Sequence, residues 1–168
     1  GDNGTYSIVV QANQVADTSG NFVAAGTVGT FTVNITDTTA PTAVGSAPNV
    51  TSGGGMMLNS PTTVDGNPTY NATVVYTDNV AINASTVGPG DIRVTGPNGF
   101  NTATDFQDVT PAGNGSPRTA TYPFQIPGGT WDAADNGTYN IVMQASQVAD
   151  TSGNFVAAGT IGSFTVNI

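Results

Sequence analysis

Four residue types are missing from this sequence: lysine, glutamate, histidine and cysteine. Arg93 and Arg118 are the only basic residues, all eleven acidic residues are aspartate, and the formal net charge is -9. Because nucleic acids and anionic membranes attract proteins through lysine and arginine, this charge excludes both as partners. Without histidine or cysteine no Ser-His-Asp or Cys-His arrangement can form, and acid–base chemistry would fall to aspartate alone. We therefore expect no enzyme.

Long apolar runs are also lacking. None approaches the roughly 18 residues of a membrane helix, so we expect no membrane insertion. The absence of cysteine removes disulfides and zinc–thiolate sites but leaves the cellular compartment open. Glycine, threonine, asparagine and serine dominate instead, and only 8% of the residues are charged. Alternating apolar segments nevertheless indicate an ordered chain, and its uncharged polar surface favours an extracellular setting.

A stretch of 34 residues occurs twice. Asp135 to Ile168 repeats Asp2 to Ile35 at a constant offset of 133 residues. The five differing pairs are Ser7/Asn140, Val10/Met143, Asn13/Ser146, Val28/Ile161 and Thr30/Ser163. The chain therefore holds one complete repeat, preceded by the end of another, which is typical of a tandem array.

The repeated stretch has the pattern of a β-hairpin. Apolar residues alternate with polar ones over 135–145 and again over 160–168, which predicts two half-buried strands joined by a loop at 149–155. Asp-Asn-Gly-Thr-Tyr precedes the first strand in both copies. In immunoglobulin-like sandwiches this motif forms a tyrosine corner at the start of strand F. We expect Tyr139 and Tyr6 to play that structural role.

Further segments predict strands at 43–50, 70–76, 91–95, 100–109 and 120–126, of which 100–109 is less regular, and a helical turn at 82–86. Pro123 marks an edge or a bulge in the last of these. Trp131, the only tryptophan, is expected to cap the core. The sequence thus predicts an all-β, immunoglobulin-like sandwich of about seven strands over 42–168. A linker at 36–41 and an extra F–G-type hairpin at 1–35 precede it.

The extra hairpin needs a partner. Six of its residues are candidates for an inward face: Tyr6, Ile8, Val10, Phe31, Val33 and Ile35. Each would forgo roughly 1.5 to 3 kcal/mol if left in water, and isolated hairpins are marginal in stability. In one interpretation, the chain begins within a repeat of a longer array. In the other, the hairpin is donated to or swapped with a neighbouring chain, which would build fibres.

Several aspartates are predicted to meet at one end of the sandwich. In this topology the linker, the loop after 70–76 and the loop at 149–155 share that end. They carry Asp37, Asp78 with Asn79, and Asp150 with Asn154; Asp17 and Asn21 hold the corresponding places in residues 1–35. Like charges gathered without lysine repel one another, and Ca²⁺ takes six to eight oxygen ligands from such loops. We therefore hypothesise a calcium site, although neither an EF-hand nor a GGxGxD motif is present.

The same residues also suit turns that bind no metal. In Asp-Thr-Ser-Gly-Asn, Asp150 can form an Asx-turn while Gly153 supplies a positive φ, and Asp78-Asn79 can close a turn of its own. Asp135 fits the turn of the tyrosine corner better than a metal site. Both interpretations of the loop aspartates stay open on the sequence alone.

Four blocks carry a resemblance to a known family. They are DTTAPT at 37–42, VVYTDNVAINASTVGPGDIRVTGPNGF at 74–100, GGTWDAADNGTY at 128–139 and VADTSGNFVAAGT at 148–160. Together they resemble the Ig-like, cadherin-like tandem repeats of very large secreted or surface proteins of bacteria, cyanobacteria especially. The resemblance implies a stalk, adhesin or matrix unit outside the cell, and calcium between successive domains.

We therefore expect a structural or adhesive repeat of an extracellular array or fibre. Its partners would be neighbouring copies of itself, joined end to end and stiffened by calcium. A calcium-dependent carbohydrate-binding module, with surface glycans as partners, is the alternative, because calcium-containing β-sandwiches often bind sugars through exposed aromatic side chains. An exposed aromatic row on one sheet face would favour that alternative.

Overall fold

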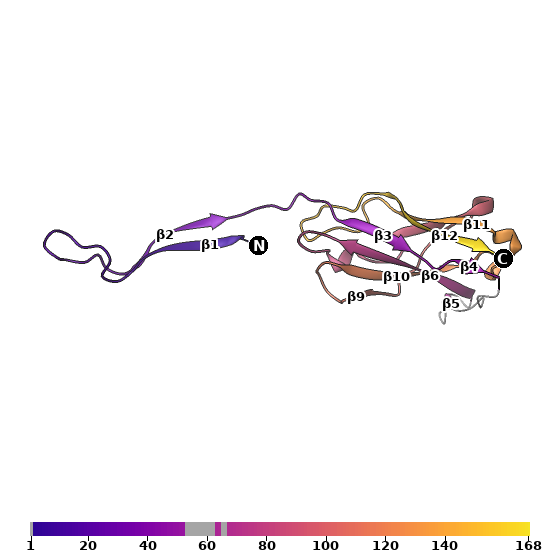
Figure 1. The fold of residues 1–168 in the computed structure, drawn as a ribbon, viewed down its shortest axis with the longest axis horizontal. Helices are drawn as coiled ribbons and strands as arrows, with labels where there is room; N and C mark the ends of the chain where they lie inside the picture. Colours follow the sequence, from indigo (N-terminus) through magenta and orange to yellow (C-terminus); the bar gives the residue numbers. More distant parts are fainter. Residues whose placement is uncertain (1, 53–62, 65–66) are drawn as a thin grey trace. The chain divides into compact units, whose positions relative to one another are not determined.

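The computed structural model describes residues 2–52, 63–64 and 67–168. The chain is all-β, as the sequence predicts, and it forms two compact units, Gly1–Asp37 and Thr38–Ile168 (Figure 1). In the part of the chain described, no helix has both the length and the apolar character needed to span a membrane.

The first unit is a two-stranded antiparallel hairpin. Strand β1 (Gly4–Val10) pairs with β2 (Gly26–Val33), and Tyr6 lies opposite Phe31. The register shifts between Ile8 and Val9, which places a β-bulge in the middle of the hairpin.

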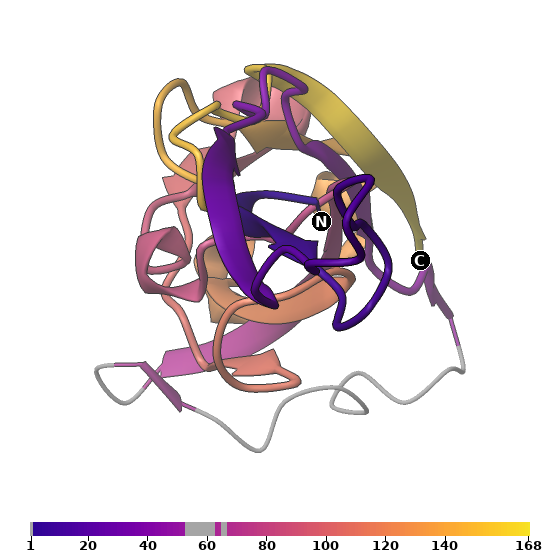
Figure 2. The same cartoon turned by 90° about the vertical axis from the view of Figure 1, so that its left-hand side faces the viewer.

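The described residues of the second unit form two sheets of five strands, and we call this unit the sandwich. The first sheet has the order β3 (Thr42–Ser46), β6 (Asn67–Thr77), β10 (Arg118–Gln125) and β9 (Asp108–Thr110), with β5 (Thr63–Val64) also paired to β6. The second has the order β4 (Val50–Thr51), β12 (Gly159–Asn167), β11 (Gly137–Met143), β7 (Ile92–Thr95) and β8 (Asn101–Ala103). The C-terminal end of β12 lies beside β4, to which it is parallel (Figure 2).

Two segments predicted as single strands are each divided between the sheets. The predicted strand at 43–50 becomes β3, which pairs with β6, and β4, which pairs with β12. Pro48 lies between them and has no N–H for a ladder. The predicted strand at 100–109 becomes β8 and β9, which again belong to different sheets. In both cases the chain crosses from one sheet to the other within a segment that was predicted as one strand.

The core lies between the two sheets. The apolar side chains of β6, β7, β10 and β11 that face this core are buried, except that of Tyr70, which is partly buried, and Trp131 joins them. The largest fully buried side chains are Tyr76, Tyr122, Tyr139, Phe124, Phe164, Ile82, Ile92, Ile141, Met143, Val74, Val94 and Val148. Pro123 pairs in register with Asn71 without a bulge, and it lies beyond the residues of β10 that pair with β9.

The described part of the sandwich also contains four short 3₁₀ turns: η1 (Ala84–Thr86), η2 (Pro97–Gly99), η3 (Pro127–Gly129) and η4 (Ala133–Asp135). The first lies within the helical turn predicted at 82–86. Its N-cap is Asn83, whose side chain accepts a hydrogen bond from the Ser85 backbone N–H.

The two sheets approach closely where β3 passes β12. A Cβ atom added to Gly162 would overlap the backbone carbonyl of Gly45, and one added to Gly45 would press against Ile141 and Ile161. Glycine at 162 is therefore needed for this contact between the edges of the two sheets. Gly162 has no positive φ, so the close packing of the two sheets, and not the backbone conformation, requires glycine at this position.

Candidate metal centre

The loop after β6 and the loop between β11 and β12 are tied together by their backbones. Asn83 N–H donates to the Ala149 carbonyl at 3.0 Å, and Thr151 N–H donates to the Ala81 carbonyl at 2.9 Å. Ile82, between these two contacts, is fully buried. The side chains of the two loops are consequently held at fixed positions beside each other.

Three of the predicted site aspartates come together at this end of the sandwich. Each of Asp37, Asp78 and Asp150 contributes one carboxylate oxygen, and these three oxygens lie within 4.8 Å of one another. Asp37 directly precedes Thr38, where the sandwich begins, and the other two come from the tied loops. Asp150 is buried, while Asp37 and Asp78 are half-buried. We call these three residues the aspartate cluster.

Asp150 is held by its own loop. Its Oδ1 accepts the N–H groups of Ser152 and Asn154, both at 2.8 Å, and its Oδ2 accepts Asn154 Nδ2 at 2.7 Å. Burial pushes the pKa of Asp150 upward, but these hydrogen bonds and one from Gly153 outweigh it and hold the pKa below its ordinary value. The carboxylate is therefore charged at neutral pH. Gly153 has the predicted positive φ, 90°.

Asp78 uses only one of its two oxygens within the protein. Oδ2 accepts the N–H groups of Val80 and Ala81, both at 2.8 Å, which is the turn predicted from the sequence. Oδ1 is buried and has no hydrogen-bond partner among the described residues. A buried carboxylate oxygen without a partner is costly, and a bound cation would satisfy it. The turn interpretation and the metal interpretation thus apply to different oxygens of one side chain.

The two predicted asparagines differ in their relation to the cluster. Asn154 donates its side-chain N–H to Asp150, so in this arrangement it positions that carboxylate. Asn79 is exposed beside Asp78, and both line a shallow hollow with Thr39, Ala40, Thr42 and Thr77. The hollow gives an ion a path to this edge of the cluster.

Asp17 and Asn21 repeat the Asp150 loop in the first unit. Asp17 Oδ1 accepts the N–H groups of Ser19 and Asn21, both at 2.9 Å, and Oδ2 accepts Asn21 Nδ2 at 2.8 Å. The hydrogen bonds from Asn21 lower the pKa of Asp17. Since both residues are exposed, the loop geometry is a property of the sequence Asp-Thr-Ser-Gly-Asn itself.

The chemistry of the cluster fits calcium. Oxygens that share one Ca²⁺ at 2.3–2.6 Å lie at most about 5 Å apart, and the three carboxylate oxygens meet this limit. Carboxylates are hard ligands, and calcium sites take their remaining oxygens from amides, carbonyls and water. Asp37, Asp78 and Asp150 are the side chains that would hold such an ion.

The residues predicted to be structural make contacts of a different kind. Tyr139 OH donates to the Asp135 carbonyl at 3.1 Å, and Tyr6 OH donates to the Asp2 carbonyl at 2.8 Å, so both copies form the corner. Burial, together with the nearby charge of Asp135, raises the pKa of Tyr139 to about 12. Trp131 packs edge-on against Tyr139 with ring centroids 5.3 Å apart.

The two aspartates before the second corner form a capping box. Asp132 Oδ1 accepts the Ala134 N–H at 2.7 Å, and Asp135 Oδ2 accepts the Asp132 N–H at 3.0 Å. Both side chains thus serve the η4 turn, as expected for Asp135 from the sequence.

A buried polar chain in the core escaped the sequence analysis. Tyr122 OH donates to Asp91 Oδ2 at 2.7 Å, and because that proton is committed, Tyr76 OH donates to Tyr122 at 2.8 Å. Gly88 N–H also donates to Asp91 Oδ2, at 2.8 Å. Burial raises the pKa of Asp91 and outweighs these hydrogen bonds. The signal that could have found this chain is an aspartate directly before a buried strand.

Comparison with protein-family models, curated proteins and solved structures finds no match for this chain.

Proposed function

We propose that this chain is a structural or adhesive repeat of an extracellular array, in which Ca²⁺ bound by the aspartate cluster stiffens the junction before each sandwich. The observation that carries the proposal is the approach of Asp37, Asp78 and Asp150 to within 4.8 Å. In a sequence without lysine, no ammonium group can offset these charges.

The strand order supports an immunoglobulin-like sandwich. In that fold, strands A, B, E and D form one sheet and strands G, F and C the other. Here β3, β6, β10 and β9 stand in the first order, and β12, β11 and β7 in the second. The tyrosine corner at Tyr139 agrees with this assignment. Immunoglobulin-like domains are suited to arrays because their chain ends lie at opposite poles.

The position of the cluster supports a junction role for the ion. Asp37 belongs to the segment that leads into the sandwich, and Asp78 and Asp150 belong to its loops. An ion shared by these residues would fix the direction of the entering chain. Residues 36–41 already restrict it, since Pro41 fixes its own φ and disfavours the helical region for Ala40.

A glycan-binding module is less well supported. Tyr122 and Trp131 are buried, and Phe155 is the only fully exposed aromatic side chain among residues 38–52, 63–64 and 67–168 whose burial is described. Sugars stack on exposed rings, and a single ring in a loop does not form the row expected of such a site.

Thermal unfolding with calcium and with chelator tests the proposal. Extracellular calcium modules have dissociation constants of roughly 0.1 to 1 mM, so about 10 mM Ca²⁺ adds about 1.4 to 2.7 kcal/mol. We expect the Tm to rise by several degrees. In Asp78→Asn the shift should vanish, because the amide keeps an acceptor for the turn but removes the charge.

The control variant is Asp108→Asn, which removes an exposed charge on β9 and should keep the full shift. In chelator, Asp78→Asn should unfold at the same temperature as the parent or higher, because it relieves repulsion without breaking the turn. An equal Tm of the parent protein in calcium and in chelator would rule out the ion.

A further inference from the structure

Two nearly identical hairpins have opposite exposures in this protein. In the sandwich, the inward side chains of β11 and β12 are buried by the other strands. In the first unit, the same residues at the same hairpin positions face solvent. The clearest pairs in exposed fraction are Tyr6 at 42% against Tyr139 at 1%, Ile8 at 53% against Ile141 at 0%, and Phe31 at 52% against Phe164 at 2%.

The exposed hairpin nevertheless has the shape of the packed one. Both contain the same register and the same bulge, at Ile8/Val9 and at Ile141/Val142. The rings of Tyr6 and Phe31 stack with centroids 5.2 Å apart, and those of the buried pair stand 5.1 Å apart. Both hairpins close with reciprocal side-chain bonds, Asn3 to Ile35 and Asn136 to Ile168. The hairpin is therefore already organised for packing.

Gly29 has no local reason to be glycine. A Cβ atom on Gly29 would meet only Ile8 Cδ1, at 3.8 Å, and its φ is not positive. Its counterpart Gly162 must be glycine, because a Cβ atom there would overlap the Gly45 carbonyl. The glycine at position 29 is thus explained if hairpin 2–35 packs against a strand that resembles β3.

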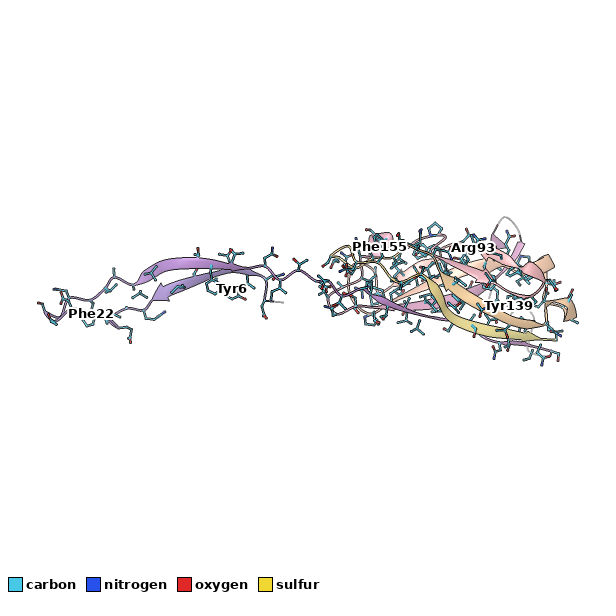
Figure 3. All side chains as sticks on the ribbon, turned by 90° about the horizontal axis from the view of Figure 1, so that it is seen from above. Tyr6, Phe22, Arg93, Tyr139 and Phe155 are labelled. Atoms are coloured by element: carbon cyan, nitrogen blue, oxygen red, sulfur yellow. The ribbon has the colours of Figure 1, made fainter. Side chains whose placement is uncertain are left out.

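Phe22 provides the contrast. It is 56% exposed in the first unit, and its counterpart Phe155 is still 46% exposed in the complete sandwich (Figure 3). The exposed side chains of the first unit therefore fall into two groups. Some side chains, such as Phe22, face solvent in both settings, and others, such as Phe31, face solvent only when the other strands of the sandwich are lacking.

We propose that hairpin 2–35 docks onto the sandwich of a second copy of this repeat, in the place that β11 and β12 occupy in the first. The surface it fits is the framework of residues 38–135, which carries the other strands of both sheets. The inference rests on the proposed array function, but it does not depend on the cation.

The sequence differences between the two hairpins permit this exchange. Only two of the five pairs involve side chains that pack on the framework, Val10 for the buried Met143 and Val28 for the partly buried Ile161. Both replacements are smaller, so they leave space and cause no overlap. The remaining pairs are polar.

The framework of the same chain is out of reach for its own hairpin. When docked, Ile35 would stand where Ile168 stands, at the end of the sandwich opposite the start of β3 (Figure 1). Gly162 lies beside Gly45, so Ile168 is about nine strand residues, or about 30 Å, beyond Thr42 along the sheet. The seven steps from Ile35 to Thr42 span at most about 25 Å. Docking therefore requires a second copy.

The test uses the full chain with a substitution that displaces its own closing hairpin, which is formed by β11 and β12. In Gly162→Ala the overlap with Gly45 should unseat β12 and open the framework to hairpin 2–35 of a neighbouring molecule. We expect concentration-dependent head-to-tail oligomers by sedimentation velocity, while the parent protein stays monomeric because its own β11 and β12 already occupy the framework. All samples contain chelator, so that a failure of the calcium site does not affect the result.

Two double variants separate docking from simple misfolding. Gly29→Ala added to Gly162→Ala should return the protein to monomers, because the donated hairpin then meets the same obstacle. Phe22→Ala added to Gly162→Ala should leave the oligomers unchanged. Monomeric Gly162→Ala would overturn the proposal. Oligomers or aggregates that persist with Gly29→Ala would also overturn it, and would indicate self-association of the exposed hairpin faces.

A second measurement does not depend on Gly162. Asn140→Ser, Met143→Val, Ser146→Asn, Ile161→Val and Ser163→Thr together give the closing hairpin the sequence of the first one. We expect this variant to fold cooperatively with a Tm lowered by several degrees, since two packed side chains become smaller. Failure of the variant to fold would show that hairpin 2–35 cannot complete the framework.

Discussion

Single residues in this protein are informative because many of them occur twice. Asp150 and Asp17 keep the same hydrogen bonds in a buried and in an exposed setting, so the loop is formed locally. Phe164 and Phe31 have the same neighbours within their hairpins and differ in what covers them. Asp91 has no counterpart in the first unit, and its environment comes entirely from tertiary packing.

Asp91 should make the stability of the sandwich depend on pH. Its pKa in the folded protein is raised by burial above the ordinary value of 3.8. Between these two pKa values the folded state binds more protons, so Asp91 lowers the free energy of unfolding as the pH rises from about 3.8 through its folded pKa. Below that window the penalty is absent, because the carboxyl is protonated in both states.

Asp91→Asn should remove this dependence. The amide oxygen can still accept the hydrogen bonds of Tyr122 and Gly88. We expect the stability of the variant relative to the parent to increase between pH 3 and pH 7, as measured by urea denaturation. A difference that is constant over this range would mean that Asp91 titrates normally in the folded protein.

At the scale of elements, the hairpins are the natural unit of comparison. Phe164 is packed between Tyr70, Tyr139 and Phe124, with ring centroids 5.1 to 6.1 Å away. Phe31 contacts the single ring of Tyr6. The same substitution should therefore have very different costs in the two hairpins.

Phe164→Ala should destabilise the sandwich by about 3 to 5 kcal/mol, because it leaves a cavity in the core. Phe31→Ala should change the stability of the sandwich by less than about 0.5 kcal/mol, because the residue is exposed. Chemical denaturation followed by the fluorescence of Trp131 measures both. Equal costs would show that β2 is covered in the monomer.

The elements also show where prediction from the sequence succeeds. The strands predicted at 135–145, 120–126 and 70–76 correspond to β11, β10 and β6, because each stays in one sheet and keeps its alternation. The crossings between sheets near Pro48 and Thr104 were missed, because the local sequence does not show which sheet a short strand joins. The approach of Asp37, Asp78 and Asp150 was predicted, because strand order decides which loops meet. The position of Asp91 directly before a buried strand hints at its burial, but its partner Tyr122 is 31 residues away and could not be identified from the sequence.

At the scale of the whole molecule, the two units should differ in local stability. The sandwich has a core between two sheets, whereas a two-stranded hairpin is marginal in water. Hairpin 2–35 and the hairpin formed by β11 and β12 carry almost the same sequence, so any difference in their opening comes from tertiary packing.

Hydrogen exchange measured by mass spectrometry can detect this difference within one sample. The peptides of β1 and β2 should exchange at least about tenfold faster than those of β11 and β12, because opening the latter disrupts the core. The five substituted pairs distinguish the peptides by mass. In the Gly162→Ala oligomers, protection should appear in β1 and β2. Equal protection in the monomer would contradict the exposure of the hairpin.

The strand directions described above have a mechanical consequence. The chain enters the sandwich at β3 and leaves at the far end of β12, and both strands run the same way (Figure 1). Ladder hydrogen bonds lie across the strands, so tension between these two points loads the bonds of β3 to β6 and of β12 to β11 in shear. Bonds loaded in shear must break together, whereas bonds that are peeled open break one after another. A sandwich pulled between these two points should therefore resist extension up to a sharp rupture force.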